Sequence, residues 1–338
     1  MPRPDLVIVG PTGNTHIAGS LARAAAASGL RCRLQDTALA YRGPALQRAF
    51  LWHMGGHRPY ELRSFSQNLF GDLATVPPRW LIAMGHAPIL SDAIHALRKL
   101  NVVCLNYASD DPWNGAHRAG WHLRALPAYD IVFTPRRANI DDLSRLGCAD
   151  VRYLPFGYDE RLFGLADARI GQAGSGDGVL FVGGGDRDRA DFFARFMRNG
   201  LRPALVGGYW DRYAHTHESS LGLKSAEEVR SLTAQAAVNL CLVRRANRDG
   251  HVMRSFEIPA CGGFMIAEES AEHREILGAE GECALFFSSP EEAAAKACRA
   301  IADAARRRTM AANAHNRITR GAHTYRDRLQ YMLEASNA

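Results

Sequence analysis

Two acidic residues, Asp249 and Glu257, are separated by seven residues, and a glycine pair, Gly262 and Gly263, follows them before a short apolar run. A carboxylate accepts hydrogen bonds from two neighbouring hydroxyls, and bonds involving a charged group contribute roughly 1.5–3 kcal/mol each. An acid early in a helix, followed by a glycine turn and a buried strand, is suited to hold a sugar. We predict that Glu257 holds the diol of a ribose and that Asp249 contacts a sugar hydroxyl, which indicates a nucleotide sugar.

Arg254 precedes Glu257 by three residues, so both side chains lie on one face of the expected helix. Two interpretations are open. Arg254 either forms a local ion pair with Glu257, or it contacts the donor phosphates and compensates the charge of a departing diphosphate.

A glycine-rich turn follows the apolar run 179–182 and precedes an expected helix. Its glycines and the arginines after them are Gly183, Gly184, Gly185, Arg187 and Arg189. Glycines let backbone amides approach an anion closely, and a helix N-terminus adds partial positive charge, so we expect a diphosphate here. The alternative is a simple tight turn, since the spacing matches neither the phosphate loop nor the dinucleotide fingerprint.

Three further residues follow apolar runs and are candidates for acid–base chemistry. His16 lies between the first expected strand and the first helix, His86 follows the run 80–83, and Asp110 follows the run 102–106. A histidine titrates near neutral pH and can act as a general base toward an acceptor hydroxyl. The alternatives are a histidine that solvates a helix start and an aspartate that marks a turn before proline.

The composition predicts a globular protein of two domains, since 338 residues exceed what one hydrophobic core usually organises. The net charge of +6 comes from dispersed arginines, which favours anionic small molecules over nucleic acid as partners. Seven widely spaced cysteines without a Cys-x-x-Cys motif indicate neither a disulfide framework nor a zinc site. We find no targeting or membrane-spanning segment and expect a cytoplasmic protein with at most peripheral membrane contact.

Short apolar runs alternate with amphipathic stretches throughout, which is typical of an α/β protein with parallel sheets. We predict two Rossmann-like, doubly wound parallel-sheet domains that face each other across a cleft, where open sheets bind ligands. The expected parts are an acceptor-binding domain over residues 1–157, a linker over 158–177, a nucleotide-sugar domain over 178–322, and a C-terminal helix over 323–338 that crosses back to the first domain.

Several motifs together resemble the group 1 glycosyltransferases, most closely their CgeB-like, spore-maturation-type branch. They are Asp110-Asp-Pro112, Tyr153-Leu-Pro-Phe-Gly157, Phe181-Val-Gly-Gly-Gly185, Gly207-Gly-Tyr-Trp210, Arg254-Ser-Phe-Glu257-Ile-Pro-Ala-Cys-Gly-Gly263 and His323-Thr-Tyr-Arg-Asp-Arg328. The resemblance covers nearly the whole chain and implies the two-domain GT-B fold.

The resemblance also assigns roles by position. The ribose-binding carboxylate falls on Glu257, and the acid that reaches the transferred sugar falls on Asp249, where relatives usually have the longer glutamate. The phosphate-neutralising residue falls on Arg187 or Arg189, and Arg254 stands in for a lysine that has no counterpart. Asp186 and Asp188 resemble the spaced acids of metal-dependent glycosyltransferases, but we expect no metal.

We therefore expect an enzyme that transfers a sugar from a nucleoside diphosphate sugar to a hydroxyl or amine acceptor, without cofactor or metal. A UDP-sugar is the expected donor, and the acceptor is a small molecule, a glycan or a lipid-linked molecule. The resemblance favours retention, in which the departing phosphate can accept the acceptor's proton; an inverting enzyme would need a base such as His16 or Asp110. The alternatives are a nucleotide-sugar epimerase or hydrolase of the same fold and a non-catalytic two-domain binding protein.

Overall fold

The computed structural model describes residues 4–13, 15–164, 176 and 178–337. The expected linker at 158–177 therefore lies partly outside the described residues. The chain divides into two compact units. The first unit comprises Met1–Pro155, Arg245–Asp249 and Tyr325–Ala338, and the second comprises Phe156–Arg244 and Gly250–Thr324.

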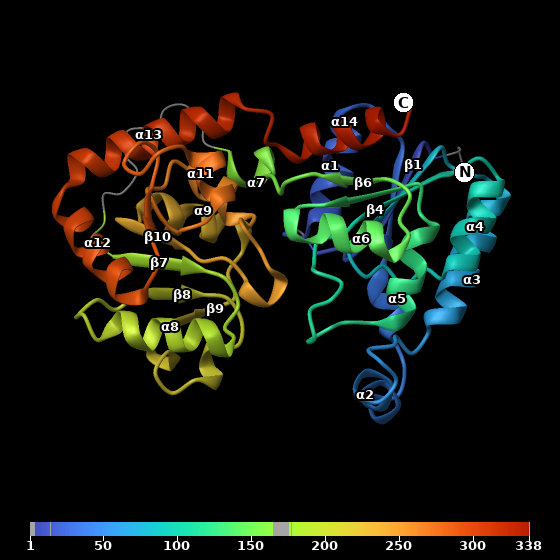
Figure 1. Cartoon of the computed structure of the whole chain (residues 1–338), viewed down its shortest axis with the longest axis horizontal. Coiled ribbons are helices and arrows are strands. Elements are labelled where there is room, and N and C mark those ends of the chain that lie inside the picture. Colours follow the sequence, from blue (N-terminus) through green and yellow to red (C-terminus); the bar gives the residue numbers. More distant parts are fainter. Residues whose placement is uncertain (1–3, 14, 165–175, 177, 338) are drawn as a thin grey trace. The chain divides into compact units, whose positions relative to one another are not determined.

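The first unit is built on a six-stranded parallel sheet with the strand order β2-β1-β3-β4-β5-β6 (Figure 1). Its strands are β1 (Leu6–Gly10), β2 (Cys32–Asp36), β3 (Trp80–Met84), β4 (Val103–Tyr107), β5 (Ile131–Thr134) and β6 (Val151–Tyr153). Its helices are α1 (Ile17–Ala27), α2 (Ala45–His53), α3 (Leu62–Thr75), α4 (Ser91–Lys99), α5 (Gly120–Ala125), α6 (Ile140–Leu146) and α14 (Tyr325–Ala335), with short 3-10 turns at Thr37–Tyr41, Leu126–Ala128, Arg137–Asn139 and Arg245–Asn247.

The second unit has a parallel sheet of the same size, with the order β12-β11-β10-β7-β8-β9. Its strands are β7 (Val179–Val182), β8 (Ala204–Val206), β9 (Ser220–Gly222), β10 (Val238–Cys241), β11 (Met265–Glu268) and β12 (Leu285–Phe287). Its helices are α7 (Glu160–Phe163), α8 (Arg187–Met197), α9 (Ala226–Gln235), α10 (Arg254–Ala260), α11 (Ala271–Leu277), α12 (Pro290–Ala302) and α13 (Ala304–Arg320), with 3-10 turns at Trp210–Arg212 and His217–Ser219.

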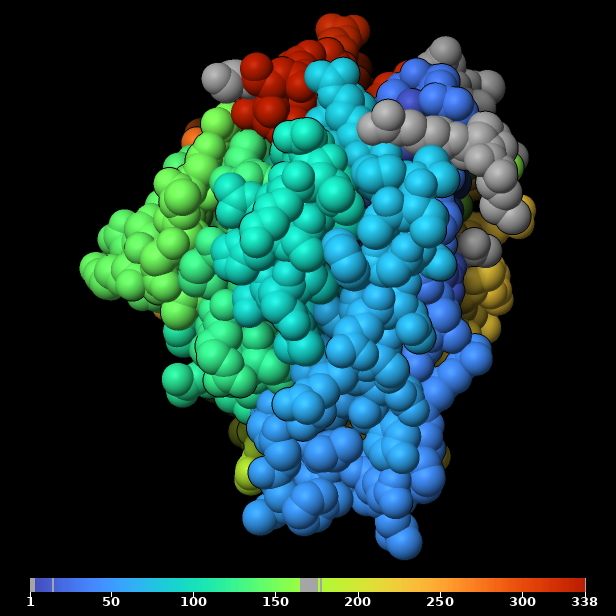
Figure 2. Space-filling view, turned by 90° about the vertical axis from the view of Figure 1, so that its right-hand side faces the viewer, coloured from blue at the N-terminus to red at the C-terminus, as the bar shows by residue number. Residues whose placement is uncertain are grey.

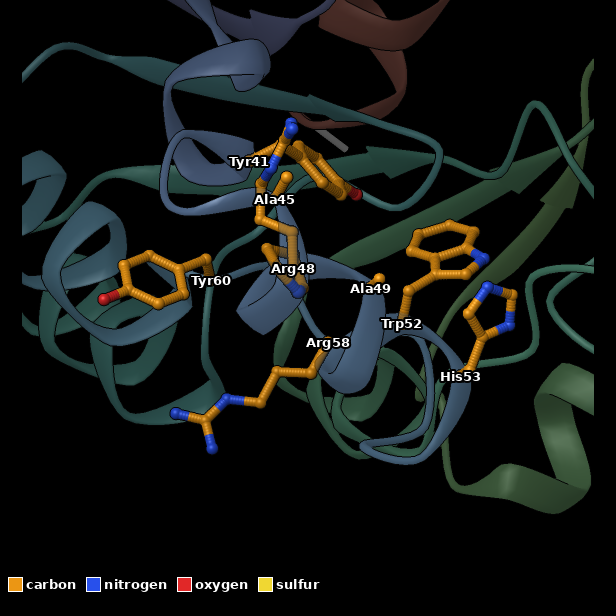
Figure 3. Close-up of a pocket in the computed structure, with 9 residues that line it drawn as sticks. Tyr41, Ala45, Arg48, Ala49, Trp52, His53, Arg58 and Tyr60 are labelled. Carbon is orange, nitrogen blue, oxygen red and sulfur yellow. The ribbon is translucent and has the colours of Figure 1, made fainter.

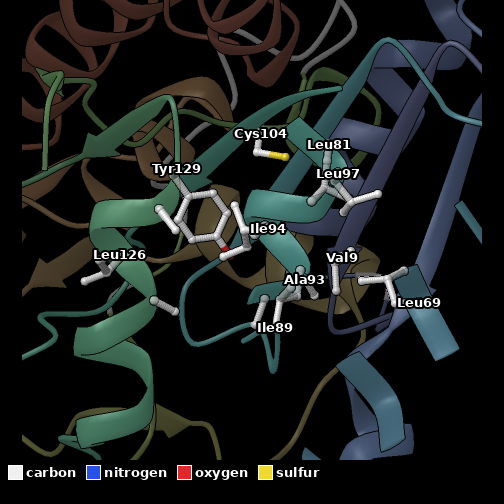
Figure 4. Close-up of a cluster of buried hydrophobic side chains, with 14 of the residues drawn as sticks. Val9, Leu69, Leu81, Ile89, Ala93, Ile94, Leu97, Cys104, Leu126 and Tyr129 are labelled. Atoms are coloured by element: carbon white, nitrogen blue, oxygen red, sulfur yellow. The ribbon is translucent and has the colours of Figure 1, made fainter. Parts of the chain in front are cut away.

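Each unit has its own apolar core. In the first unit, side chains of α4 such as Ile94 and Leu97 pack between the sheet and the segment that carries Leu126 and Tyr129 (Figure 4). In the second unit, Phe193 and Phe196 of α8 pack in one cluster with strand residues of the sheet. Strands buried on both faces consist of continuous apolar residues, which explains why the sequence pattern predicts the central strands.

The prediction of two doubly wound α/β sheets is confirmed. In each sheet the chain first builds outward from one strand and then crosses over to the other side of it. The crossover leaves a topological switch point between β1 and β3 in the first sheet and between β7 and β10 in the second. Open parallel sheets bind ligands outside the carboxyl ends of the strands at such points.

Candidate functional site

The glycine turn of the second unit lies at the switch point, directly after β7. The amide of Gly183 donates to the carbonyl oxygen of Val206 at 2.8 Å, and the amide of Gly185 donates to that of Gly208 at 2.9 Å. Gly207 has a φ of +141°, and a Cβ there would lie 2.3 Å from the oxygen of Gly183. The turn is therefore held against the loop after β8. Within the described residues, the Gly184 amide makes no such bond and is the one amide of the turn left for an anion.

Arg189 lies close to this turn, because its Nη1 donates to the carbonyl oxygen of Gly184 at 2.9 Å. The side chain of Asp186 caps α8 by accepting from the backbone amide of Arg189 at 2.9 Å. The negative charge of that carboxylate at the helix N-terminus disfavours a second anion there, so we expect side chains to contribute most to holding one. Arg187, the first residue of α8, is exposed and is available for this purpose.

Glu257 and Arg254 lie one turn apart on α10 and form an ion pair through Arg254 Nη1 and Glu257 Oε2. The Glu257 side chain is 7% exposed and the Arg254 side chain 25% exposed. Burial raises the pKa of Glu257, and the charge of Arg254 opposes that shift. The local ion pair expected as one interpretation is therefore present. The second carboxylate oxygen, Oε1, accepts no hydrogen bond from any described residue.

Arg189 of α8 and Arg254 of α10 both lie near the end of β10. Burial raises the pKa of the Cys241 thiol to about 12, and the charges of Arg254 and Arg189 both act against this shift. The Sγ of Cys241, the last residue of β10, lies 3.7 Å from the Ser255 hydroxyl, which places the start of α10 at this strand end. Arg189 contacts the turn after β7, the neighbouring strand. The structure thus brings Gly184, Arg189, Arg254 and Glu257 to the carboxyl edge of the second sheet.

A buried hydrogen-bond network fixes the start of α10. The Ser255 hydroxyl is 2.7 Å from His273 Nε2, and His273 Nδ1 is 2.6 Å from the carbonyl oxygen of Glu268. Because the carbonyl can only accept, Nδ1 carries the proton and Nε2 accepts from Ser255. Burial lowers the pKa of His273 to about 4, which keeps the ring neutral at neutral pH.

His251 makes a second buried connection just before α10. Its Nδ1 lies 2.5 Å from Glu272 Oε2, and its Nε2 accepts from the backbone amide of Phe156 at 3.1 Å. These partners are far from His251 in the sequence, so neither spacing nor composition indicated this network. The only signal in the sequence is that His251 lies between Asp249 and Glu257.

Gly262 and Gly263 do not join the other candidate binding residues. They form the turn that enters β11, and a Cβ on Gly263 would lie 2.8 Å from Asn239 Nδ2, at the start of β10. Gly262 has a φ of +71°. The pair therefore lies at the amino edge of the sheet, opposite the glycine turn after β7, and its role there is to allow close packing.

In the first unit, His16, His86 and Asp110 follow β1, β3 and β4, so all three lie at the carboxyl edge of the first sheet. His16 is exposed at the N-cap position of α1 and makes no side-chain cap hydrogen bond. Asp110 is half-buried and accepts from Asn247 Nδ2 at 3.3 Å.

His86 belongs to a cluster of histidines. Its ring centroid is 4.9 Å from that of His117 and 4.2 Å from that of His122. Burial and the neighbouring His117 lower the pKa of His86 to about 4, while Asp110 opposes the shift. The Nε2 atoms of His86 and His122 are buried without a hydrogen-bond partner in the described part of the chain. A ring with so low a pKa is a weak base at neutral pH.

Asp249 lies in the first unit, where its Oδ1 accepts from Arg136 Nε at 2.5 Å. Arg136 also donates to the carbonyl oxygens of Ala108 and Ser109, at 3.1 and 2.8 Å. The two side chains are 1% and 4% exposed, for Arg136 and Asp249 respectively. Sequence reasoning missed Arg136, because nothing near it in the chain indicates its partner.

Asp111, next to Asp110, is buried and accepts from Arg248 Nε at 2.5 Å and from Asn139 Nδ2 at 3.2 Å. Arg248 also pairs with Asp142 at 2.7 Å. The neighbouring aspartates thus differ: Asp111 is fully engaged in ion pairing, and Asp110 is the one that keeps partial exposure.

Over residues 4–13, 15–164, 176 and 178–337, no group of three or more His, Cys, Asp or Glu is arranged to hold a metal ion. Asp186 is occupied as a helix cap, and Asp188 is exposed in the first turn of α8. Among the described helices, none combines the length and the apolar character needed to cross a bilayer.

The sequence of residues 187–334 matches a protein family described as glycosyl transferase-like. The match contains α8, with Arg187 and Arg189, and α10, with Arg254 and Glu257. A search of the curated proteins finds no match to the chain.

Solved structures resemble the chain over its whole length. HepE of Anabaena, in complex with UDP and glucose, has a TM-score of 0.66 at 14% identity, over 98% of this chain and 99% of that chain. Sucrose-phosphate synthase of Thermosynechococcus elongatus has a TM-score of 0.70 at 16% identity, over 99% and 98%. A trehalose-6-phosphate synthase studied for glycosyl transfer with retention has a TM-score of 0.64 at 14% identity, over 98% and 99%. At these identities the likeness establishes the fold.

Proposed function

We propose that this chain, a GT-B type glycosyltransferase by its fold and by the family match of residues 187–334, transfers a sugar from a UDP-sugar to a hydroxyl or amine acceptor without a metal ion. One observation carries the proposal: Arg189, Arg254 and Glu257 converge on the carboxyl ends of β7 and β10, beside the Gly184 amide. We assign the chain to the CgeB-like branch on its motifs.

The donor's parts match the groups at this edge. The diphosphate is held by Arg187, Arg189 and Arg254, whose guanidinium groups form charge-assisted, bidentate hydrogen bonds with phosphate oxygens. The ribose diol donates to Glu257 Oε1, the oxygen that Arg254 leaves unused. UDP is the nucleotide we propose, and support comes from HepE, which was solved with UDP.

The arginines also supply the chemistry that a metal supplies in other enzymes. As the bond from the sugar to the diphosphate breaks, negative charge grows on the leaving phosphate, and fixed cations stabilise it. We propose transfer with retention, in which the departing phosphate accepts the acceptor's proton. The similar trehalose-6-phosphate synthase, which was studied for glycosyl transfer with retention, supports this. His16 and Asp110 are the bases that an inverting reaction would need.

A thermal-shift panel of nucleoside diphosphate sugars tests the proposal, because a ligand that binds only the folded state stabilises it by about 2.7 kcal/mol at 100 times its Kd. We expect UDP-sugars to raise the melting temperature by several degrees and ADP- and GDP-sugars to raise it less. No shift with any donor would contradict the proposal. Conversion of the donor in the absence of acceptor would favour an epimerase or hydrolase instead.

A further inference from the structure

The short helix α2 of the first unit carries an apolar face that no described residue covers. Leu46, Phe50 and Met54 are 87%, 64% and 75% exposed. They are spaced four residues apart and therefore lie along one side of the helix. α2 has no buried residue and projects from the lower end of the first unit (Figure 1). The space-filling view shows the same blue segment at the lower end of the visible face (Figure 2).

The charged residues around α2 are all basic. Between Asp36 and Glu61 there is no acidic residue, whereas Arg42, Arg48 and Arg58 all fall in this stretch. None of these arginines forms an ion pair with a described residue, and the Nε of Arg58 is buried without a hydrogen-bond partner among them. This stretch therefore carries uncompensated positive charge next to the exposed apolar side chains.

A pocket of about 310 Å³ lies along α2, on a different side of the helix from Leu46 and Phe50 (Figure 3). Arg48 and Trp52 of α2 line it together with Tyr41, Arg58 and Tyr60. Tyr41 and Trp52 are in ring contact, with centroids 6.4 Å apart. The walls thus combine guanidinium groups with aromatic rings that have polar edges, which is the composition found where proteins meet lipid headgroups.

We propose that α2 docks the first unit on an anionic lipid bilayer. Leu46, Phe50 and Met54 enter the boundary between headgroups and acyl chains, as the apolar face of an interfacial helix does. The arginines of this stretch, Arg42, Arg48 and Arg58, bind lipid headgroup phosphates. Each basic residue near an anionic surface adds to the attraction, which salt weakens.

The size of the apolar face favours a bilayer over a protein partner. A stable protein interface needs roughly 20–30 residues on each side, and the two apolar side chains of this nine-residue helix, with Met54 directly after it, fall far short of that. Reversible membrane binding needs only a few inserted side chains together with cations. The second unit also has exposed apolar side chains, such as Leu223. Acidic residues lie close to Leu223 in the sequence, at Glu227 and Glu228, so its surroundings are not purely basic.

Sedimentation of the full chain with lipid vesicles tests the proposal. Vesicles that contain about 30% phosphatidylglycerol in phosphatidylcholine should bind the protein at low salt, and pure phosphatidylcholine should bind it weakly. The double variant Leu46→Ser, Phe50→Ser and the double variant Arg48→Gln, Arg58→Gln should each lower binding by about tenfold or more. High salt should weaken vesicle binding of the wild type as the arginine substitutions do, because both remove electrostatic attraction. It should not reproduce the loss caused by the serine substitutions, which remove apolar contacts.

Two matched controls leave α2 intact. Leu223→Ser removes an equally exposed leucine, and Arg202→Gln removes an exposed arginine; neither should change vesicle binding. Absence of binding to anionic vesicles, or binding that the α2 variants leave unchanged, would overturn the proposal. Size-exclusion chromatography gives a further test. If the wild type eluted as a larger species and Leu46→Ser, Phe50→Ser as a monomer, a second copy of the chain would cover the apolar face, and the proposal would also be overturned. The UDP affinity of each variant serves as the folding control. It is measured without vesicles, so it does not depend on whether the protein binds lipid.

Discussion

Asp249 and Glu257, the two acids of the sequence motif, have different surroundings. Glu257 is paired with an arginine on its own helix, one turn away, and keeps one oxygen without a partner among the described residues. Asp249 is paired with Arg136, which is distant in the sequence and buried. A buried charge that loses its partner is costly, so the Asp249 carboxylate has a structural task whatever else it contacts.

Asp249→Asn should therefore lower the free energy of unfolding by roughly 3–5 kcal/mol, because the Arg136 guanidinium would lose its buried carboxylate. Urea denaturation measures this effect. The control Glu291→Gln breaks the exposed pair with Arg195 and should cost less than about 1 kcal/mol. If Asp249→Asn abolished sugar transfer while stability stayed unchanged, direct contact with the sugar would be its main role.

At the scale of elements, the apolar pattern predicts the central strands of both sheets and the edge strands β6 and β12. The two strands that the apolar pattern missed, β2 and β9, are both at sheet edges and are only partly buried. An edge strand has no need of a continuous apolar run, so CRLQD and SLG carry no clear signal. α13 was also missed as a separate helix, because the alanine-rich pattern continues through Asp303, where α12 ends and the side chain caps α13.

The loop after β8 is an element whose role only the structure reveals. It fixes the glycine turn after β7 through the contact of Gly207 with Gly183. Gly207→Ala should destabilise the protein by at least about 2 kcal/mol, since the side chain needs an unfavourable φ and collides with the backbone of Gly183. It should also weaken UDP binding, because Gly184 would move with Gly183. Urea denaturation and calorimetry measure the two effects.

Gly208→Ala is the matched control. A Cβ there meets only Leu223 Cδ2, at 4.0 Å, and the backbone of Gly208 has no positive φ in the restricted range. Its effect on both measurements should be small. Equal losses from the two substitutions would show that the loop does not act through Gly207.

For the whole molecule, the alternation of apolar runs predicted two parallel α/β sheets, because continuous apolar strands require cover on both faces. The carboxyl ends of those strands also indicated where Arg189, Arg254 and Glu257 lie. The networks of Arg136, His251 and His273 could not be predicted, since each joins residues from separate elements. Gly262 and Gly263 show the limit of spacing alone, because a glycine pair near an acid also arises from a packing turn at the opposite sheet edge.

The central claim is that the second unit holds a nucleoside diphosphate through Glu257 and its neighbouring arginines. Calorimetric titration of UDP into the wild-type protein and into Glu257→Gln tests it most directly, with Glu291→Gln as control and thermal unfolding as a check of folding. The account predicts that Glu257→Gln raises the Kd about tenfold or more, since a charged acceptor of the ribose hydroxyls is lost. A folded Glu257→Gln variant that binds UDP as tightly as the wild type would contradict it.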